Sequence, residues 1–289
     1  MRRLLRPIVE LREGETATAV LMFTYSFLAM TSYNIVKPAT RSTFISGLGA
    51  DNLPWVQLVA GILIGFIMQG YSRAIGLVPR RWAIPVTQLA CVGLLLALWL
   101  PLSAKQEWAS VAFYVLGLIL GILLISQFWT LANGIYDPRQ AKRLFGFVGG
   151  GVMLGGMTGS GLTALIIESI GTNALLLVSA GALVACMTIV AMVLGREQGA
   201  ITAGAGGDDE RGVTMTRALQ LLRESRQIQI IALIISFGSF GAALLDQQVN
   251  MAAEVFKGAG QEDSIGAFLA QIRLQASGVT AEAPQALWF

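Results

Sequence analysis

Long apolar stretches recur along the chain, and short polar segments separate them. A helix needs about 20 apolar residues to span the hydrocarbon core of a bilayer. Seven stretches meet this length, and they cover residues 17–36, 53–71, 82–102, 108–132, 145–167, 174–194 and 228–245. Each is expected to be helical, because lipid offers no partner to an unpaired backbone amide. The pattern therefore predicts an all-α, polytopic membrane protein.

The composition excludes an ordinary soluble domain. Hydrophobic residues make up 55% of the chain, charged residues only 13%, and the mean hydropathy is +0.67. Soluble domains typically carry about 25% charged residues. The lipid bilayer is therefore the expected surrounding of this chain.

Arg and Lys are concentrated in alternate connections. They lie in the N-terminal arm and in the connections after the second, fourth and sixth spans, where fifteen of the 20 basic residues occur. Basic connections stay in the cytoplasm. The N-terminus is therefore expected on the cytoplasmic face of the inner (plasma) membrane of a bacterium. Topology accounts for the net charge of +3, so no nucleic-acid partner is expected.

Changes in polarity divide the chain into four parts. Residues 1–195 hold six spans, and 196–227 form a polar linker with a short amphipathic helix near 218–223. Residues 228–273 hold the seventh span and the start of an incomplete second bundle, and 274–289 form a polar tail. Six helices, a basic linker and a seventh helix form the layout of the major facilitator type, in which two six-helix halves enclose a central site. We expect a chain truncated or frameshifted near Arg273, and the alternative is a natural seven-helix protein.

Glycines four residues apart predict where helices approach each other closely. Such pairs occur in the second, fourth and fifth spans, as Gly61/Gly65, Gly117/Gly121, Gly146/Gly150, Gly151/Gly155 and Gly155/Gly159. They are interpreted as packing surfaces or as flexible points of a rocking bundle.

The residues that enzymes most often use are scarce. The chain has no His and only two Cys, which removes the commonest general base and any structural zinc site. No Ser, Cys or Thr stands in a recognisable catalytic motif. We therefore predict neither an enzyme nor a cofactor or metal site.

The candidate binding residues are ionisable groups near membrane depth, which usually line a cavity or an ion path. Lys37 and Arg41 follow the first span and would share one face of a helix that continues through Pro38. Two cations suit an anionic substrate, and Arg offers bidentate contacts to phosphate or carboxylate oxygens. Asp246, at the end of the seventh span, is able to pair with these cations or to carry a proton. The alternatives are snorkelling cations and a solvated helix end.

A second basic group lies in the connection between the fourth and fifth spans. It consists of Arg139, Lys142 and Arg143. The positive-inside rule explains these cations without a functional role. A cytoplasmic gate that attracts anions is the other interpretation.

Two motifs resemble the nucleotide (ATP/ADP) translocase family. They are Phe-Trp-Thr-Leu-Ala-Asn at 128–133 and Ala-Lys-Arg-Leu-Phe-Gly at 141–146. Tyr-Asn-Ile-Val-Lys at 33–37 with Arg41 resembles the cationic first helix of that family, and Leu-Asp-Gln at 245–247 resembles the acidic end of its seventh helix. The resemblance covers roughly residues 6–273, and it implies a major facilitator fold that exchanges ATP for ADP or imports nucleotides with protons.

The resemblance also implies a set of substrate-binding residues, which are Lys37, Arg41, Asn133, Asp246 and Gln247. The chain departs from the family pattern at three places. Gln140 stands where an acid is usual, Ala39-Thr40 adds a residue to the first-helix motif, and the second half is missing. The expected function is secondary transport of a nucleotide or a related anionic solute by alternating access. The alternatives are transport of another organic anion and a membrane scaffold that does not transport.

Overall fold

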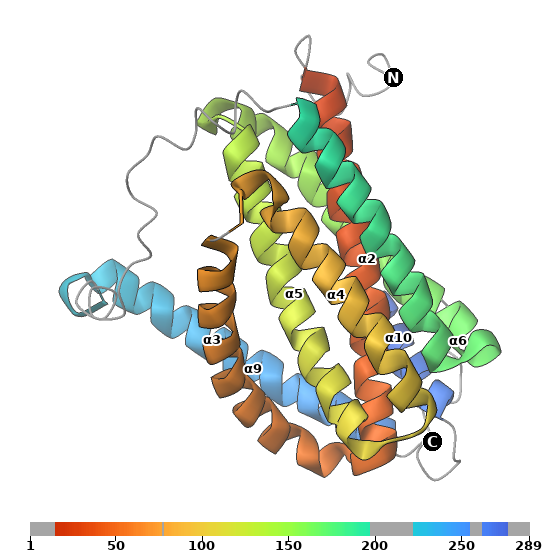
Figure 1. Cartoon of the computed structure of the whole chain (residues 1–289). Coiled ribbons are helices and arrows are strands. Elements are labelled where there is room, and N and C mark those ends of the chain that lie inside the picture. The colour runs from red at the N-terminus through yellow and green to blue at the C-terminus, as the bar shows by residue number, and fades with distance from the viewer. Residues whose placement is uncertain (1–14, 77, 197–221, 255–261, 277–289) are drawn as a thin grey trace.

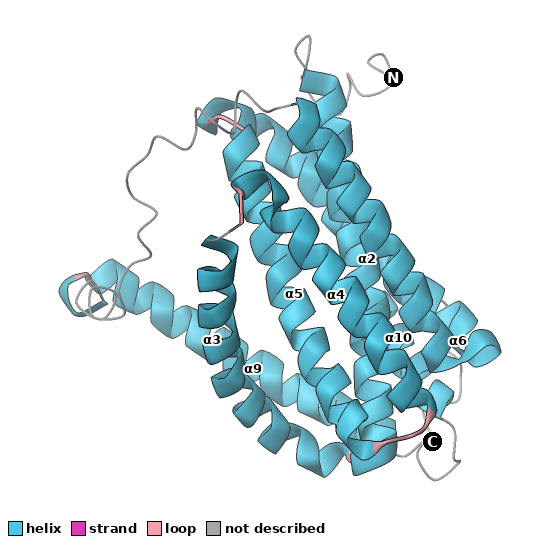
Figure 2. Ribbon diagram, viewed as in Figure 1, coloured by secondary structure: helices cyan, strands magenta, loops and turns pink. Residues whose placement is uncertain are grey.

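Figure 1 shows a computed structural model of the chain, in which long helices pack side by side. The structure describes residues 15–76, 78–196, 222–254 and 262–276. These residues are helical apart from short connections, and no strand occurs among them (Figure 2). The prediction of an all-α protein is confirmed.

Within the described ranges, seven helical segments are long and apolar enough to cross a membrane. The described elements are α2 (Glu15–Leu48), the short 3₁₀ helix η1 (Ala50–Asn52), α3 (Leu53–Gly76), α4 (Arg80–Ser103), α5 (Glu107–Ile135), α6 (Pro138–Arg196), α9 (Arg226–Glu254) and α10 (Glu262–Ala276). α6 supplies two of the seven segments, because Gly171 breaks it with φ 78° and ψ 161°, a backbone conformation that glycine adopts readily. The seven predicted spans are confirmed, and the protein is membrane-embedded.

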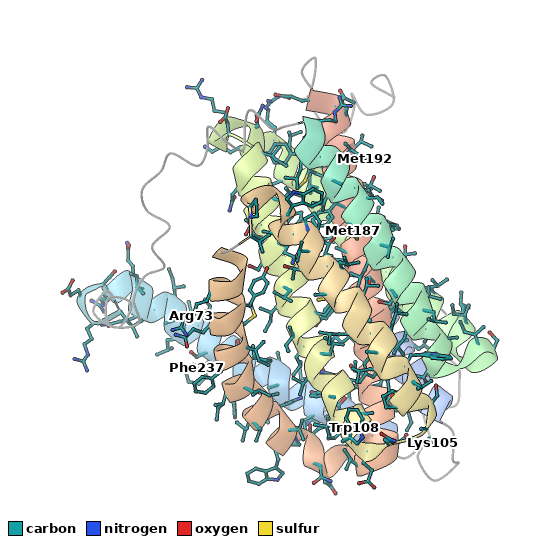
Figure 3. The ribbon with its side chains drawn as sticks, viewed as in Figure 1. Arg73, Lys105, Trp108, Met187, Met192 and Phe237 are labelled. Atoms are coloured by element: carbon teal, nitrogen blue, oxygen red, sulfur yellow. The ribbon has the colours of Figure 1, made fainter. Side chains whose placement is uncertain are left out.

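Exposed tryptophans mark two levels along the helices. We name the two ends of the bundle after α2, the Glu15 end and the Leu48 end. Trp108 at the beginning of α5 lies at the Leu48 end, beside Lys105 of the connection from α4 (Figure 3). Exposed Trp129 lies near the Glu15 end of α5. A helix rises 1.5 Å per residue, so these two levels are about 30 Å apart. This spacing is close to the thickness of a bilayer core, where tryptophans gather at the interfaces.

Two helices extend further than their apolar stretches, and here the sequence-based positions were wrong. α2 continues through Pro38 to Leu48, so Lys37 and Arg41 lie inside the helix and not after it. α9 continues to Glu254, so Asp246 also lies inside a helix. Polarity does not end these helices, because their polar residues contact other helices. Thr40 Oγ1 also donates to the Lys37 carbonyl of its own helix, at 2.9 Å.

Glycines bring α6 close against α2. A Cβ added at Gly155 would overlap the Phe27 carbonyl, and one added at Gly151 would overlap that of Phe23. Two hydrogen bonds cross the same contact, from Ser26 Oγ to the Val148 carbonyl at 2.9 Å and from Thr31 Oγ1 to the Gly155 carbonyl at 3.2 Å. At this close approach, hydroxyl groups of α2 therefore form hydrogen bonds to backbone carbonyls of α6.

The other predicted glycine pairs divide into two groups. Gly117 lies against Thr40, and Gly121 lies against Tyr33, so this pair brings α5 close to α2. In contrast, no atom of another described helix lies within 4 Å of a Cβ built at Gly61, Gly65 or Gly146, so an added methyl group would meet open space there. The glycine pattern alone therefore does not identify a packed surface.

Within the described residues, the packing contacts of α9 lie toward its C-terminal end. None of its most apolar 18-residue stretch is buried, and in Figure 1 the beginning of α9 lies well away from α2. Near its other end, Val249 and Ala253 join a buried apolar cluster with Phe44 of α2, Leu53 of α3 and Leu269 of α10. This Leu48-end cluster holds α9 and α10 against the first bundle.

Several sequence predictions lie partly or wholly outside the described residues. Of the proposed amphipathic helix in the linker, only the end is described, and residues 222–224 are helical. The N-terminal arm, most of the 196–227 linker and most of the polar tail lie outside the described residues. In the region after the seventh span, where the sequence predicts the start of an incomplete second bundle, the structure describes the helix α10.

Candidate anion site between α2 and α9

Arg41 is a buried cation in the second half of α2, toward the Leu48 end. Its side chain is only 7% exposed. The preceding residue, Thr40, lies against Gly117 of α5. Gly117 is nine residues from Trp108, which is about 14 Å along a helix. Arg41 is therefore well inside the level that Trp108 marks, and not at a membrane surface.

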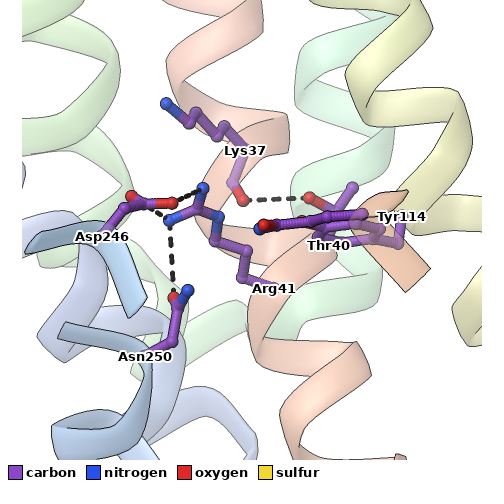
Figure 4. A network of polar contacts seen from close by, with 7 residues as sticks. Lys37, Thr40, Arg41, Tyr114, Asp246 and Asn250 are labelled. Atoms are coloured by element: carbon purple, nitrogen blue, oxygen red, sulfur yellow. Dashed lines mark hydrogen bonds and ion pairs between the residues drawn. The ribbon is translucent and has the colours of Figure 1, made fainter. Parts of the chain in front are cut away.

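Asp246 of α9 binds Arg41 through both of its carboxylate oxygens (Figure 4). Arg41 Nη1 donates to Oδ1 at 2.5 Å, and Nη2 donates to Oδ2. This two-point contact is the strongest geometry for a guanidinium and a carboxylate. The Asp246 side chain remains 35% exposed. The carboxylate therefore occupies both terminal nitrogens of the guanidinium, which we call the Arg41 fork, and it remains partly exposed.

Asn250 is a further member of this group that the sequence analysis did not select. It lies one turn after Asp246 on α9, and its side chain is completely buried. Its Oδ1 accepts a hydrogen bond from Arg41 Nη1 at 3.4 Å. Its Nδ2 has no hydrogen-bond partner among the described residues. The four-residue spacing from Asp246 was the available signal, since it places both side chains on one helix face.

Lys37 lies one turn before Arg41 on α2, and Figure 4 shows both side chains on the same side of the helix. Its Nζ is 5.8 Å from the centroid of the Tyr33 ring, within the range of a cation–π contact. The structure thus places a second cation beside the Arg41–Asp246 pair.

Two predicted substrate contacts lie elsewhere. Gln247 Nε2 donates to the carbonyl of Ala50 at 3.3 Å, which ties α9 to η1. Asn133 is exposed near the Glu15 end of α5. It is sixteen residues, or about 24 Å of helix, from Gly117 at the level of Arg41. The structure therefore does not bring Asn133 to the Arg41 site.

The three cations predicted as a gate differ in their surroundings. Arg143 Nη2 lies 3.2 Å from Glu15 Oε1, and Gln140 Nε2 donates to the same oxygen at 3.0 Å. Arg139 and Lys142 are exposed at the same end of the bundle. Arg143 thus connects the beginnings of α2 and α6, whereas the other two cations face outward.

The interior of the first bundle holds a second polar group. Gln88 Nε2 of α4 lies 3.4 Å from both Tyr25 Oη of α2 and Gln127 Oε1 of α5. Cys91 and Cys186 are free and buried, as expected for packing residues. Within the described ranges, no group of three or more possible His, Cys, Asp or Glu metal ligands occurs.

Comparisons with protein-family models, with curated proteins and with solved structures find no match for this chain.

Proposed function

We propose that the protein is a secondary transporter of an anionic solute, and that the solute binds Arg41 by displacing the Asp246 carboxylate. The contact between Arg41 and Asp246 is the observation that supports this proposal most directly. Ionisable residues within membrane helices are costly and usually mark substrate or ion pathways. A guanidinium fork also accepts carboxylate and phosphate oxygens in the same two-point geometry.

In this mechanism, Asp246 acts as an internal anion that neutralises Arg41 while the site is empty. An incoming anion replaces the carboxylate and thereby breaks the ionic contact between α2 and α9. Binding then favours a different relative position of these two helices, since a ligand shifts an equilibrium toward the state to which it binds better. Alternating access requires such a link between site occupancy and helix position.

A nucleotide is the proposed solute. The support is the resemblance of the 128–133 and 141–146 motifs to nucleotide translocases, together with Lys37 as a second cation for a phosphate chain. The proposed architecture is of the major facilitator type, in which helices of a second bundle would cover the apolar surface of α9. The proposed location is a bacterial inner membrane with the N-terminus in the cytoplasm, as the distribution of cations indicates.

The test is ADP binding to the purified full chain in lipid nanodiscs, measured by calorimetry. Asp246→Asn removes the competing carboxylate and is expected to tighten ADP binding about tenfold, because a charge-assisted contact no longer has to be broken. Arg41→Gln is expected to abolish binding. Arg139→Gln, an exposed cation outside the site, is the matched control and should bind as the wild type does. Absence of ADP binding in both the wild type and Asp246→Asn would overturn the nucleotide assignment.

A carboxylate solute is the second candidate, because the occupant of the Arg41 fork in this structure is itself a carboxylate. The two candidates differ in competition. If organic dicarboxylates bind Asp246→Asn and excess ATP does not displace them, the solute is a carboxylate and the nucleotide proposal is wrong.

A further inference from the structure

Asn250 carries a side-chain amide donor that has no acceptor among the described residues. The side chain is completely buried, and its Oδ1 is directed at Arg41. Its Nδ2 finds no acceptor among the described residues. Figure 4 shows the amide end of Asn250 beside the guanidinium of Arg41. A buried donor without a partner costs free energy. A hydrogen bond from Nδ2 to a bound anion would remove that cost, so it would contribute more to binding than a hydrogen bond from a solvated amide does.

The Asp246 carboxylate does not provide an acceptor for Asn250 Nδ2. A carboxylate has two oxygens in one plane, and the fork of Arg41 engages both oxygens of Asp246. A sulfonate or a terminal phosphate has three outer oxygens arranged as a tetrahedron. When two of them occupy the fork, the third projects out of the guanidinium plane and is able to accept from a neighbouring donor.

We infer that Asn250 determines specificity at this site, and that its Nδ2 makes the Arg41 fork prefer tetrahedral oxyanions to planar carboxylates. This inference rests on the proposed function, in which a solute anion displaces Asp246. Asn250 also positions the fork, because its Oδ1 accepts from Arg41 Nη1. The Asp246 carboxylate is then a poorer match for the site than a tetrahedral anion, which favours its displacement by the solute.

The test uses two small monoanions that differ in shape and not in charge, methanesulfonate and acetate. Both are titrated into the purified full chain in nanodiscs, with binding followed by the shift in thermal unfolding. The wild type is expected to bind methanesulfonate about tenfold more tightly than acetate, the ratio for one additional hydrogen bond to a charged group. The ratio of the two affinities is the readout, since a merely structural defect would weaken both anions alike.

Two substitutions remove the donor in different ways. Asn250→Leu replaces the amide with an apolar group of similar size, and Asn250→Asp keeps an acceptor for Arg41 but lacks the amide donor. In both variants the ratio is expected to fall to about one, although Asn250→Asp should bind each anion more weakly through charge repulsion. Gln248→Leu, on an exposed position of the same helix, is the control and should keep the wild-type ratio.

The outcomes separate the two proposals. If the wild type binds both anions and the ratio survives in Asn250→Leu and Asn250→Asp, the role of Asn250 is wrong while the Arg41 site stands. If neither anion nor inorganic phosphate binds the wild type or Asp246→Asn, the anion site itself is wrong, and the inference about Asn250 falls with it.

Discussion

α2 and α9 are both membrane-length helices, yet they have opposite surroundings. Half of the most apolar 18-residue stretch of α2 is buried, whereas none of the corresponding stretch of α9 is. α2 carries hydroxyl groups that bond to other helices, such as Ser32, whose Oγ lies 2.7 Å from Ser179 Oγ. In α9, Ser236 Oγ bonds only to the Ala232 carbonyl of its own helix, at 2.7 Å. These serine hydroxyls thus form hydrogen bonds to another helix where one lies close, and to a carbonyl of their own helix where none does.

The two helices meet only near the Leu48 end. Arg41, Asp246 and Asn250 form the polar part of this contact, and Phe44 and Ala253 belong to its apolar part. The bonds that hold α9 in place are therefore partly the bonds that the proposed solute would break. The contrast between a buried helix and an exposed one predicts that substitutions matter most in the apolar core, less at the ionic contact, and least at the Glu15 end.

The sharpest contrast lies between two phenylalanines. Phe44 of α2 is completely buried and lies 5.3 Å from the Tyr114 ring, measured between centroids, whereas Phe237 of α9 is 70% exposed. Phe44→Ala should lower the free energy of unfolding by about 3–5 kcal/mol, because it leaves a cavity. Phe237→Ala should change it by less than about 0.5 kcal/mol. Unfolding in mixed detergent and SDS measures both values, and equal losses would refute the contrast.

Two glycines test the same contrast between buried and exposed surroundings with a substitution that adds only one methyl group. A Cβ at Gly155 overlaps the Phe27 backbone of α2, whereas nothing lies within 4 Å of a Cβ at Gly241 of α9. Gly155→Ala should cost about 1–3 kcal/mol through overpacking. Gly241→Ala should be neutral or slightly stabilising, since alanine favours helices. Thermal unfolding of the two variants in the same detergent gives the comparison, and an unchanged Gly155→Ala would show that the α2–α6 contact is looser than described.

The ionic contact between α2 and α9 should have a measurable coupling energy. A double-mutant cycle with Arg41→Gln and Asp246→Asn is expected to give about 1–2 kcal/mol, which is less than for a fully buried pair because Asp246 is 35% exposed. Lys105→Gln combined with Asp246→Asn is the control cycle, as Lys105 is exposed in the connection between α4 and α5. A coupling energy near zero in the first cycle would mean that the pair does not hold α9.

The smallest effect is expected at the opposite end of α2. Glu15→Gln should lose about 0.5–1 kcal/mol, because the pair with Arg143 is partly exposed, 14% at Glu15 and 26% at Arg143, and such pairs are weak. The loss should shrink further at high salt, which screens exposed charges. Lys142→Gln, on an exposed neighbour, should change nothing measurable. A salt-independent loss above about 1 kcal/mol would assign Glu15 a larger role than that of one surface pair.

The sequence was sufficient to predict the spans but not their ends. A hydropathy pattern reports the balance between lipid and water for each segment, so all seven spans were found. It does not report contacts between helices, and for that reason the predicted spans 17–36 and 228–245 stopped short of the ends of α2 and α9 at Leu48 and Glu254. The same limitation explains Asn133, which was grouped with Arg41 by family resemblance although the fold keeps the two apart.

By itself, the sequence determined that this is a helical membrane protein with seven spans, because the transfer of apolar side chains into lipid is a local property of each segment. Only the tertiary structure decided which polar residues meet. It brought Asp246 and Asn250 to Arg41 across some 200 residues of chain and bonded Gln247 to η1. It also left open space, among the described residues, at the Cβ positions of Gly61 and Gly65. Such pairings depend on how helices are oriented and packed against one another, and no local pattern carries that information.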